Sequence, residues 1–336
     1  MLDLLSYAAF FLVTALSYGI ICLGLNVQWG QTGLFNVGVA GFVAIGAYTS
    51  ALLTTPDAVG RFGGFGLPIW AGWIAAPLVA GAAAAVIGAI TLRLRADYLA
   101  ITTFGIAIAI QLVALNAETV TGGPFGVGFI PRAFGGLEDR PIIFNLANLL
   151  LVGTVTALLY YGLERLVRSP WGRVLRAIRE DETAALSLGK NANYFRIQAF
   201  ALGSAIMGLG GAVSAHFIGF IAPENYVSTM TFQVWAMLIV GGSGSNRGAI
   251  AGTFVVWGLW TLSGVAISLV LPARWQAQAG ALQSILVGLV LVLTLLLRPQ
   301  GLLGGRELWP KRRGLKREAV AVEDRDDRDK TGVASA

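Results

Sequence analysis

Long stretches of this sequence carry no charged side chain, and that feature restricts the possible folds more than any other. No Asp, Glu, Lys or Arg lies between residues 3 and 57, 61 and 93, 97 and 118, 140 and 164, 196 and 224, 224 and 247, 247 and 274, or 274 and 298. A helix needs about 20 mostly apolar residues to cross a bilayer. Most intervals therefore hold one spanning helix, and the first holds two.

The composition agrees with a membrane protein. Of the 336 residues, 56% are hydrophobic and 12% are charged, whereas soluble domains carry about 25% charged residues. Backbone groups in lipid must be paired inside helices or a closed barrel, and barrel strands alternate apolar with polar residues. Residues 281–297 are apolar on all sides. We therefore predict an all-α polytopic membrane protein with about 8–10 transmembrane helices, and exclude a water-soluble globule, a disordered chain and a disulfide scaffold.

Nine spans are expected, near residues 5–25, 34–53, 68–92, 98–115, 142–167, 197–217, 231–240, 249–271 and 281–297. Together they form a transmembrane domain over residues 1–305, with a long loop at 168–196. Residues 306–336 are charged, and the segment 318–330 has no large apolar side chain after Val322, so we expect a disordered tail. Cys22 falls inside the first span and predicts no disulfide.

Two places predict irregular structure at membrane depth. Polar and glycine residues at 26–33, N-V-Q-W-G-Q-T-G, indicate a break in the first charge-free interval. The span at 231–240 is short and is followed by a Gly-rich stretch at 241–248, so it is either a re-entrant piece or a short helix followed by a turn. Irregular backbone survives at that depth only where protein or a water-filled cavity covers it.

Basic residues predict the orientation, because short cytoplasmic loops are enriched in Lys and Arg. They gather at residues 93–95, 165–196 and 298–317, which fall on one side of the membrane if the spans are as given. We assign that side to the cytoplasm. The C-terminus is then cytoplasmic, and nine spans place the N-terminus outside; a tenth span would reverse only the N-terminus. The basic residues at 311–317 are expected to contact anionic membrane lipid.

The longest loop on the basic side predicts a pair of short amphipathic helices outside the membrane. Pro170 suits a helix start, and Gly189 can end a helix in the left-handed conformation. Between them an apolar stripe recurs at helical spacing: Val174, Leu175, Ile178, Ala184, Ala185 and Leu188. The pair either lies on lipid as an interfacial element or inserts into the groove of a soluble partner. The acidic triplet at 180–182 favours the partner, because it would repel anionic headgroups.

This loop, G-R-V-L-R-A-I-R-E-D-E-T-A-A-L-S-L-G at 172–189, resembles the E-A-A loop of ABC importer permeases, with Glu182, Ala184, Ala185 and Gly189 in the pattern's places. More narrowly, it resembles the M-type permeases of branched-chain amino acid ABC uptake systems. Four further stretches are similar to that family: G-L-F-N-V-G-V-A-G-F-V-A-I-G-A-Y at 33–48, L-R-A-D-Y-L-A-I-T-T at 94–103, T-G-G-P-F-G-V at 121–127 and R-P-Q-G-L-L at 298–303. The resemblance spans residues 5–305.

The resemblance implies an ABC importer permease fold in the inner membrane. A periplasmic or extracellular binding protein would deliver substrate, and a homologous H-type subunit would complete the pathway. Two ATPase subunits would dock on the coupling loop, at Gly172, Arg173, Arg176, Arg179, Glu180, Asp181, Glu182, Ala184, Ala185 and Gly189. The chain has no G-x-x-x-x-G-K-[ST] phosphate loop. We therefore expect it to be no enzyme and to hold no cofactor, with ATP used by the partner subunits.

The sequence also departs from the family. Ile108 and Gln111 stand where a glutamate and an arginine or lysine are expected in the fourth span. Asn36 and Val39 lie near positions where the second span usually carries a serine and a histidine. The substrate is therefore open: branched-chain amino acids, a related amino acid, or urea and short amides.

Polar residues inside the spans are the candidates for the substrate path: Asn26, Gln31, Asn36, Thr102, Thr103 and Gln111. The alternative for each is an interhelical hydrogen bond, worth about 0.6 kcal/mol on average. The charge-free spans argue against a proton relay or ion-coupling site. A stand-alone secondary carrier, the alternative from another functional class, would need such a site or inverted repeats.

His216 is the single histidine of the chain. A metal site would need further His, Cys or acidic ligands nearby, and a catalytic site would need a paired nucleophile or acid. We predict a packed or interface-facing imidazole, no metal and no catalytic residue. Without an aromatic-basic surface module, no nucleic acid binding is expected.

Overall fold

The computed structural model of the chain describes residues 2–57, 62–94, 96–270, 278–298 and 300–303. Regular structure in these residues is helical, and the only strand-like contact among them is one antiparallel bridge between Val127 and Ile221. This confirms the predicted all-α class. The chain divides after Gly304 into two units, and the predicted tail at 306–336 lies outside the described residues. The domain boundary near residue 305 therefore stays a prediction.

Seven helical segments have the length and hydropathy to cross a membrane. They are α1 (Leu2–Leu25) with its extension η1 (Asn26–Gln31), α3 (Ile69–Thr91), α4 (Ala96–Asn116), α6 (Pro141–Arg168), α9 (Ala192–Ile218), α11 (Asn246–Val270) and α12 (Ala279–Leu297). Two shorter apolar helices, α2 (Val39–Thr54) and α10 (Ser228–Gly241), complete the set. Each of the nine predicted spans thus overlaps a helix, although the span predicted at 34–53 begins five residues ahead of α2.

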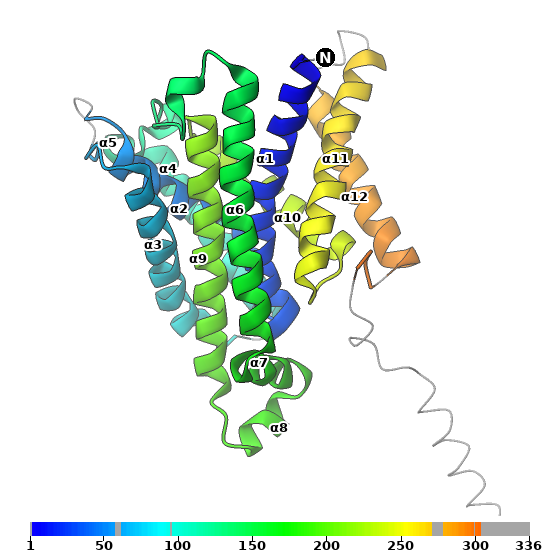
Figure 1. Cartoon of the computed structure of the whole chain (residues 1–336). Helices are drawn as coiled ribbons and strands as arrows, with labels where there is room; N and C mark the ends of the chain where they lie inside the picture. The colour runs from blue at the N-terminus through cyan, green and yellow to red at the C-terminus, as the bar shows by residue number, and fades with distance from the viewer. Residues whose placement is uncertain (1, 58–61, 95, 271–277, 299, 304–336) are drawn as a thin grey trace, which may run out of the picture. The chain divides into compact units, whose positions relative to one another are not determined.

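The helices alternate in direction, so the short elements separate onto two sides (Figure 1). One side holds the N-terminal end of α1 with α5 (Glu118–Thr121), η2 (Gly123–Phe125), η3 (Gly135–Leu137) and η4 (Pro223–Tyr226). The other side holds α7 (Pro170–Glu180) and α8 (Glu182–Ser187). The end of α12 belongs to this second side, because the amides of Leu302 and Leu303 donate to the last carbonyls of α10, at Val240 and Gly241.

Irregular backbone inside the bundle lies at residues 33–38, ahead of the short helix α2. Protein groups satisfy its polar atoms: the Val37 amide donates to the Thr103 hydroxyl at 3.0 Å, and Trp235 donates to the Asn36 carbonyl at 2.9 Å. Such pairing is what allows non-helical backbone at membrane depth. The predicted break at 26–33 is therefore wrong in position. The chain stays helical through Gln31, as a π-helix, because its polar side chains find partners on other helices and need no water.

For the segment at 231–240 the sequence predicts either a re-entrant piece or a short helix followed by a turn. The structure shows the second, with α10 followed by a turn at 242–245. Gly248 and Gly252 of α11 pack on Gly241 of α10, so closely that a Cβ on either would overlap the Gly241 backbone. Gly244 lies in the turn, with a φ of +89°.

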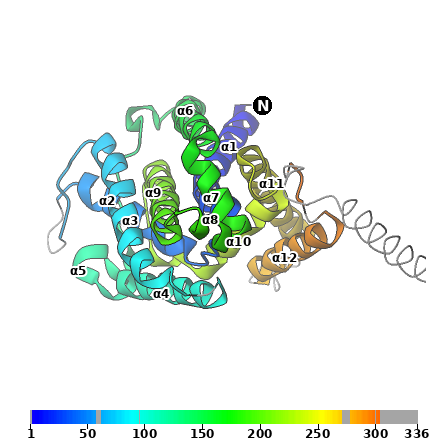
Figure 2. The ribbon, with the colours of Figure 1, turned by 90° about the horizontal axis from the view of Figure 1, so that it is seen from below.

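Helix α9 lies at the centre of the bundle and packs on α1, α2 and α3 (Figures 1 and 2). Its contacts are backbone to backbone in places: a Cβ at Gly46 of α2 would overlap Gly208 of α9. Ala76 and Ala80 of α3 face the same glycine. Small residues allow this close approach, which is how helices associate without a hydrophobic driving force between them.

Candidate functional site

The α7–α8 segment, residues 170–187, lies across the ends of the surrounding helices (Figure 2). Pro170 occupies the first turn of α7, and a Cβ at Gly172 would overlap the Val167 backbone of α6. Leu175 and Ile178 are buried. The exposed residues of α7 are Pro170 at its start and then Arg173, Ala177 and Glu180. This one-sided burial confirms the predicted amphipathic helix outside the spans.

Asp181 separates α7 from α8 and caps the second helix. Its Oδ1 accepts hydrogen bonds from the Ala184 amide at 3.0 Å and the Thr183 hydroxyl at 2.7 Å. These hydrogen bonds, that of Thr183 first, lower the pKa of the Asp181 carboxyl, because they favour its charged form. A carboxylate at a helix N-terminus also meets the positive end of the helix dipole.

Gly189 ends α8 in the left-handed conformation, as predicted, with a φ of +74°. The Lys190 amide donates to the Ala185 carbonyl and the Gly189 amide to the Leu186 carbonyl, at 3.1 and 2.9 Å. This is the hydrogen-bond pattern of a Schellman motif. Ala185 itself is buried against Ile178 and Ala192, which together form a small apolar core of their own.

Glu182 is bonded within the chain. Its two carboxylate oxygens accept hydrogen bonds from Nη1 and Nη2 of Arg196, at 2.8 and 2.9 Å. Arg196 lies in the second turn of α9, so this bidentate pair ties α8 to a spanning helix. Planar two-point pairing of this kind fixes orientation as well as distance.

Arg179 links α7 to the end of the first span. Its Nη1 donates to the backbone carbonyl of Gly30, in η1. The side chain is half-buried, and this burial lowers the pKa of the guanidinium, while the charge of Glu180 acts in the opposite direction. Helix α7 thus contacts η1 directly, although the two elements are far apart in the sequence.

A polar cluster lies next to this contact, and its members are Asn26, Gln31 and Asn246, which are buried, and Glu164 and Gly244, which are half-buried. Asn26 donates to the Asn246 side chain at 2.9 Å and accepts from the Gly244 amide at 2.8 Å. Gln31 donates to the Gly244 carbonyl at 2.9 Å. Asn246 in turn donates to Glu164 at 3.1 Å. The cluster therefore joins η1, the turn before α11, and α6.

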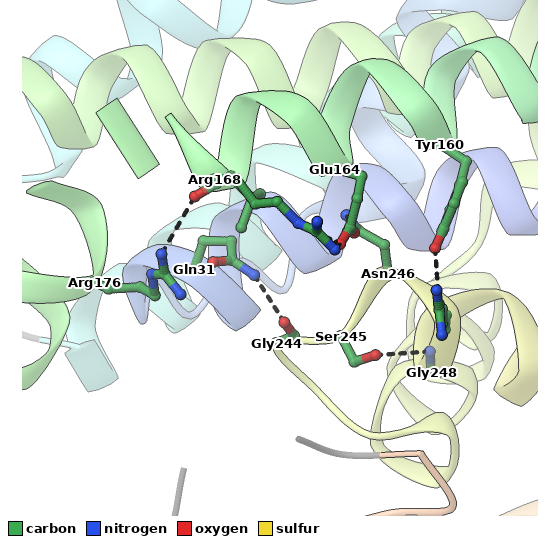
Figure 3. Close-up of polar contacts among 11 residues, drawn as sticks. Gln31, Tyr160, Glu164, Arg168, Arg176, Gly244, Ser245, Asn246 and Gly248 are labelled. Atoms are coloured by element: carbon green, nitrogen blue, oxygen red, sulfur yellow. Dashed lines mark hydrogen bonds and ion pairs between the residues drawn. The ribbon is translucent and has the colours of Figure 1, made fainter. Parts of the chain in front are cut away.

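Two arginines near the C-terminal end of α6 extend this network (Figure 3). Arg168 donates to the other carboxylate oxygen of Glu164 through Nε at 3.1 Å and Nη2 at 2.6 Å. Arg176 of α7 donates to the Val167 carbonyl at 3.4 Å. Basic groups at the carboxyl end of a helix interact favourably with its unpaired carbonyls.

The six predicted path residues separate into two groups. Asn26, Gln31, Asn36 and Thr103 are buried, with exposed fractions of 0–3%, and all four are hydrogen-bonded in the clusters described above. Thr102 and Gln111 are half-buried on α4, and the side chain of neither makes a hydrogen bond to another described residue. The first group holds helices and irregular backbone together, and only the second keeps polar atoms available.

Two of the cavities bounded by described residues lie at opposite ends of the helices. One, of about 440 Å³, lies beside the α7–α8 segment and is lined by residues 33–35, Leu92, Arg93, Leu94, Leu99, Glu182, Asn193 and Arg196. The other, of about 780 Å³, lies at the opposite end and is lined by Pro56, Asp57, Phe125, Gly128, Phe129, Gly219 and Phe220. Of the predicted site residues, only Glu182 lines either cavity.

His216 is packed, with 1% of its surface exposed. Its Nδ1 lies 2.7 Å from the Pro131 carbonyl and its Nε2 lies 2.8 Å from the Ser50 hydroxyl. Nδ1 must carry the proton to donate to a carbonyl, so Nε2 accepts from Ser50. Among the described residues, no group of three or more His, Cys, Asp or Glu side chains is placed to hold a metal ion.

Sequence reasoning missed three partners that complete the site: Glu164, Asn246 and Arg196. Glu164 carried a visible signal, since Arg168 follows it by four residues on a helix. Asn246 is the first residue of α11, directly after a Gly-rich turn, and bonds a residue 220 positions away. Arg196 is 14 positions from Glu182. No local spacing rule connects such pairs.

Residues 7–295 match the family described as branched-chain amino acid transport system / permease component. The chain is 35% identical over 311 residues to the high-affinity branched-chain amino acid transport system permease protein LivM of Escherichia coli K12. This similarity covers 85% of this chain and 67% of that protein. It is 29% identical to the probable LivM permease of Methanocaldococcus jannaschii, over 70% of this chain and 75% of that protein.

A second type of permease is also similar. The chain is 25% identical to the permease protein LivH of Salmonella typhimurium, over 87% of this chain and 92% of that protein. No solved structure matches.

Proposed function

The chain belongs to the family of branched-chain amino acid transport permease components, and on this basis we propose that it is the M-type permease subunit of an ABC importer for branched-chain or related amino acids. It is a multi-pass membrane protein. The similarity covers the spans and the whole α7–α8 segment, which is the single observation that carries the proposal.

The surface of the α7–α8 segment supports docking of a soluble partner. Leu186 and Leu188 are 51% and 78% exposed, and Tyr194 on the following turn is 59% exposed. All three lie outside the predicted spans, so lipid tails do not cover them. Exposed apolar groups rimmed by charged ones are typical of protein interfaces. We propose that one ATPase subunit binds here, while the other binds the second permease.

The remaining partners follow from the proposed complex. A homologous H-type permease would form the pathway with this chain, and its class is represented among the relatives by LivH. A binding protein would deliver substrate on the side of the N-terminus, in the periplasm or outside the cell. The ATPase subunits would use ATP, since this sequence carries no phosphate loop of its own.

For the substrate path we propose Thr102 or Gln111 on α4 as the contacting residue, since nine positions place the two on opposite faces of the helix. Their side-chain polar atoms make no bond to described residues, whereas Asn26, Gln31, Asn36 and Thr103 are engaged in holding the helices. Amide and hydroxyl groups suit the ammonium and carboxylate of an amino acid as hydrogen-bond partners.

We propose the inner membrane as the location, with the α7–α8 segment and the C-terminus in the cytoplasm. The three basic regions of the sequence support this orientation. A transmembrane domain over residues 1–305 and a charged tail at 306–336 remain part of the proposal.

Co-purification tests the assembly. The full chain, tagged at its C-terminus, is extracted in mild detergent from its own membranes, and the associated proteins are identified by mass spectrometry. We expect one second permease and two ATPase subunits for each tagged chain. Recovery of the tagged chain alone, with substrate uptake independent of ATP, would instead indicate a stand-alone secondary carrier.

A further inference from the structure

We infer that Arg179 is a positioning residue, which carries movement of the α7–α8 segment to the π-helical end of α1. The inference rests on the proposed function, because it concerns how that segment passes movement into the spans. Its starting point is the hydrogen bond from Nη1 of Arg179 to the carbonyl of Gly30, between elements 149 residues apart in sequence.

The structure holds the Arg179 side chain in place from two directions. Leu175 and Ile178 are buried on the inner face of α7 and fix the helix against the bundle. On the other side, Gly33 has a φ of +74°, and a Cβ there would come within 3.2 Å of the Arg179 Cγ. A larger residue at position 33 would therefore displace the arginine. The glycine at position 33 thus leaves room for the Arg179 side chain.

The partner of Arg179 is a neutral carbonyl. Among the described residues no ion pair involves Arg179, and Glu180 acts on it only through space. The guanidinium lies at the carboxyl end of the first span, where unpaired carbonyls carry partial negative charge. The strength of a hydrogen bond to a carbonyl depends on its angle and distance. A small movement of α7 relative to η1 therefore weakens this hydrogen bond.

Segment η1 is suited to receive that movement. It is a single π-helical stretch at the end of a long α-helix, and such stretches are frequent at functional sites. Its side chains bond several elements: Gln28 donates to the Phe200 carbonyl of α9 at 2.8 Å, and Asn26 and Gln31 bond the turn before α11. A shift of η1 therefore acts on α9 and on that turn together.

The other arginines of α7 make no such connection. Arg176 donates to the Val167 carbonyl of the neighbouring helix α6, and Arg173 is exposed. The ends of the α7–α8 segment join α6 and α9 covalently, and Glu182 adds a second tie to α9. Arg179 is thus the contact that reaches the first span. A bond that differs between two states is what shifts their equilibrium.

The test uses the complete transporter in proteoliposomes, with internal ATP and radiolabelled leucine outside with its binding protein. The variants are Arg179→Met, which removes the donor, and Arg179→Lys, which keeps one charged donor. Arg140→Met, on the opposite side of the membrane, is the matched control because Arg140 is exposed and lies outside the proposed machinery. Subunit stoichiometry, ATP hydrolysis and leucine uptake are measured on each preparation.

For Arg179→Met we expect leucine uptake per ATP hydrolysed to fall by about tenfold, the loss expected for a hydrogen bond to a charged group. Arg179→Lys should recover part of that ratio, and Arg140→Met should not change it. An unchanged ratio in Arg179→Met, or loss of the ATPase subunits from that variant, would overturn the inference. Absence of ATP-driven uptake in the wild type would overturn the proposed function itself.

Discussion

Arg196 binds both carboxylate oxygens of Glu182, at 2.8 and 2.9 Å, and so fastens α8 to the first turns of α9. The resemblance placed Glu182 in a surface for docking. The structure adds that its charge is already paired within the chain, with 42% of the Glu182 side chain and 23% of the Arg196 side chain exposed. Glu182 therefore acts by holding the shape of the α7–α8 segment.

Reversing the charge at Glu182 should disconnect the segment. Glu182→Lys places two cations together, so we expect the assembled complex to lose substrate-stimulated ATP hydrolysis, measured by phosphate release. Membrane insertion should be unaffected, because a half-exposed ion pair contributes only about 0–1 kcal/mol to stability. The double variant Glu182→Arg, Arg196→Glu should restore part of the activity. Normal stimulation in Glu182→Lys would remove this pair from the mechanism.

Gly189 should tolerate no side chain without strain. No atom lies within 4 Å of a Cβ built there, so Gly189→Ala meets no clash, and its only penalty is the φ of +74°. That conformation costs a non-glycine residue about 1–2 kcal/mol. We expect several-fold faster amide exchange at Lys190, whose amide closes the turn, measured by hydrogen exchange. Gly162→Ala, in α6 and equally uncrowded, is the control and should not accelerate it.

The bond between Asn26 and Asn246 should contribute to stability. Asn26→Ala leaves the half-buried Gly244 amide without its acceptor, and an unpaired amide costs about 1–3 kcal/mol when it is fully buried. We expect a lower Tm in detergent for Asn26→Ala and for Asn246→Ala. The double variant should lose less than the sum, because the residues share one bond. Thr154→Val, whose hydroxyl bonds only its own helix, should change Tm little. Additive losses would mean that the two side chains act independently.

The cap of α8 should depend on pH in the acid range. Hydrogen bonds lower the pKa of Asp181 below its usual value of 3.8. Its contribution is therefore complete above the unfolded pKa and is lost as pH falls through the lower, folded one. We expect protection of the Ala184 amide from exchange to decline only below about pH 4, and Asp181→Ala to abolish both the protection and its pH dependence. Protection that declines between pH 5 and 7 would contradict this assignment.

Much of the fold could be predicted because its main determinant is local. Intervals without charge locate helices directly, and the predicted span at 98–115 differs from α4 by a few residues at each end. The helix pair at 170–187 followed from Pro170, the apolar stripe and Gly189, each of which acts on its own neighbours in sequence.

The details of the polar cluster could not be predicted in the same way. Asn26, Gln31 and glycine at 26–33 have the composition of a break, yet their partners near Asn246 keep the segment helical. Such partners are far apart in sequence and meet only once the helices pack. A π-helix of six residues is also too short to show a periodic sequence pattern that would distinguish it from an α-helix or a loop.

Uptake by vesicles tests the importer assignment most directly. Vesicles that contain only this polypeptide are compared with vesicles that contain the complete set of permease and ATPase subunits, with ATP inside and binding protein and labelled leucine outside. We predict accumulation against a gradient only in the complete set, and none when ATP is replaced by a non-hydrolysable analogue. Accumulation by the single polypeptide without ATP would contradict the assignment.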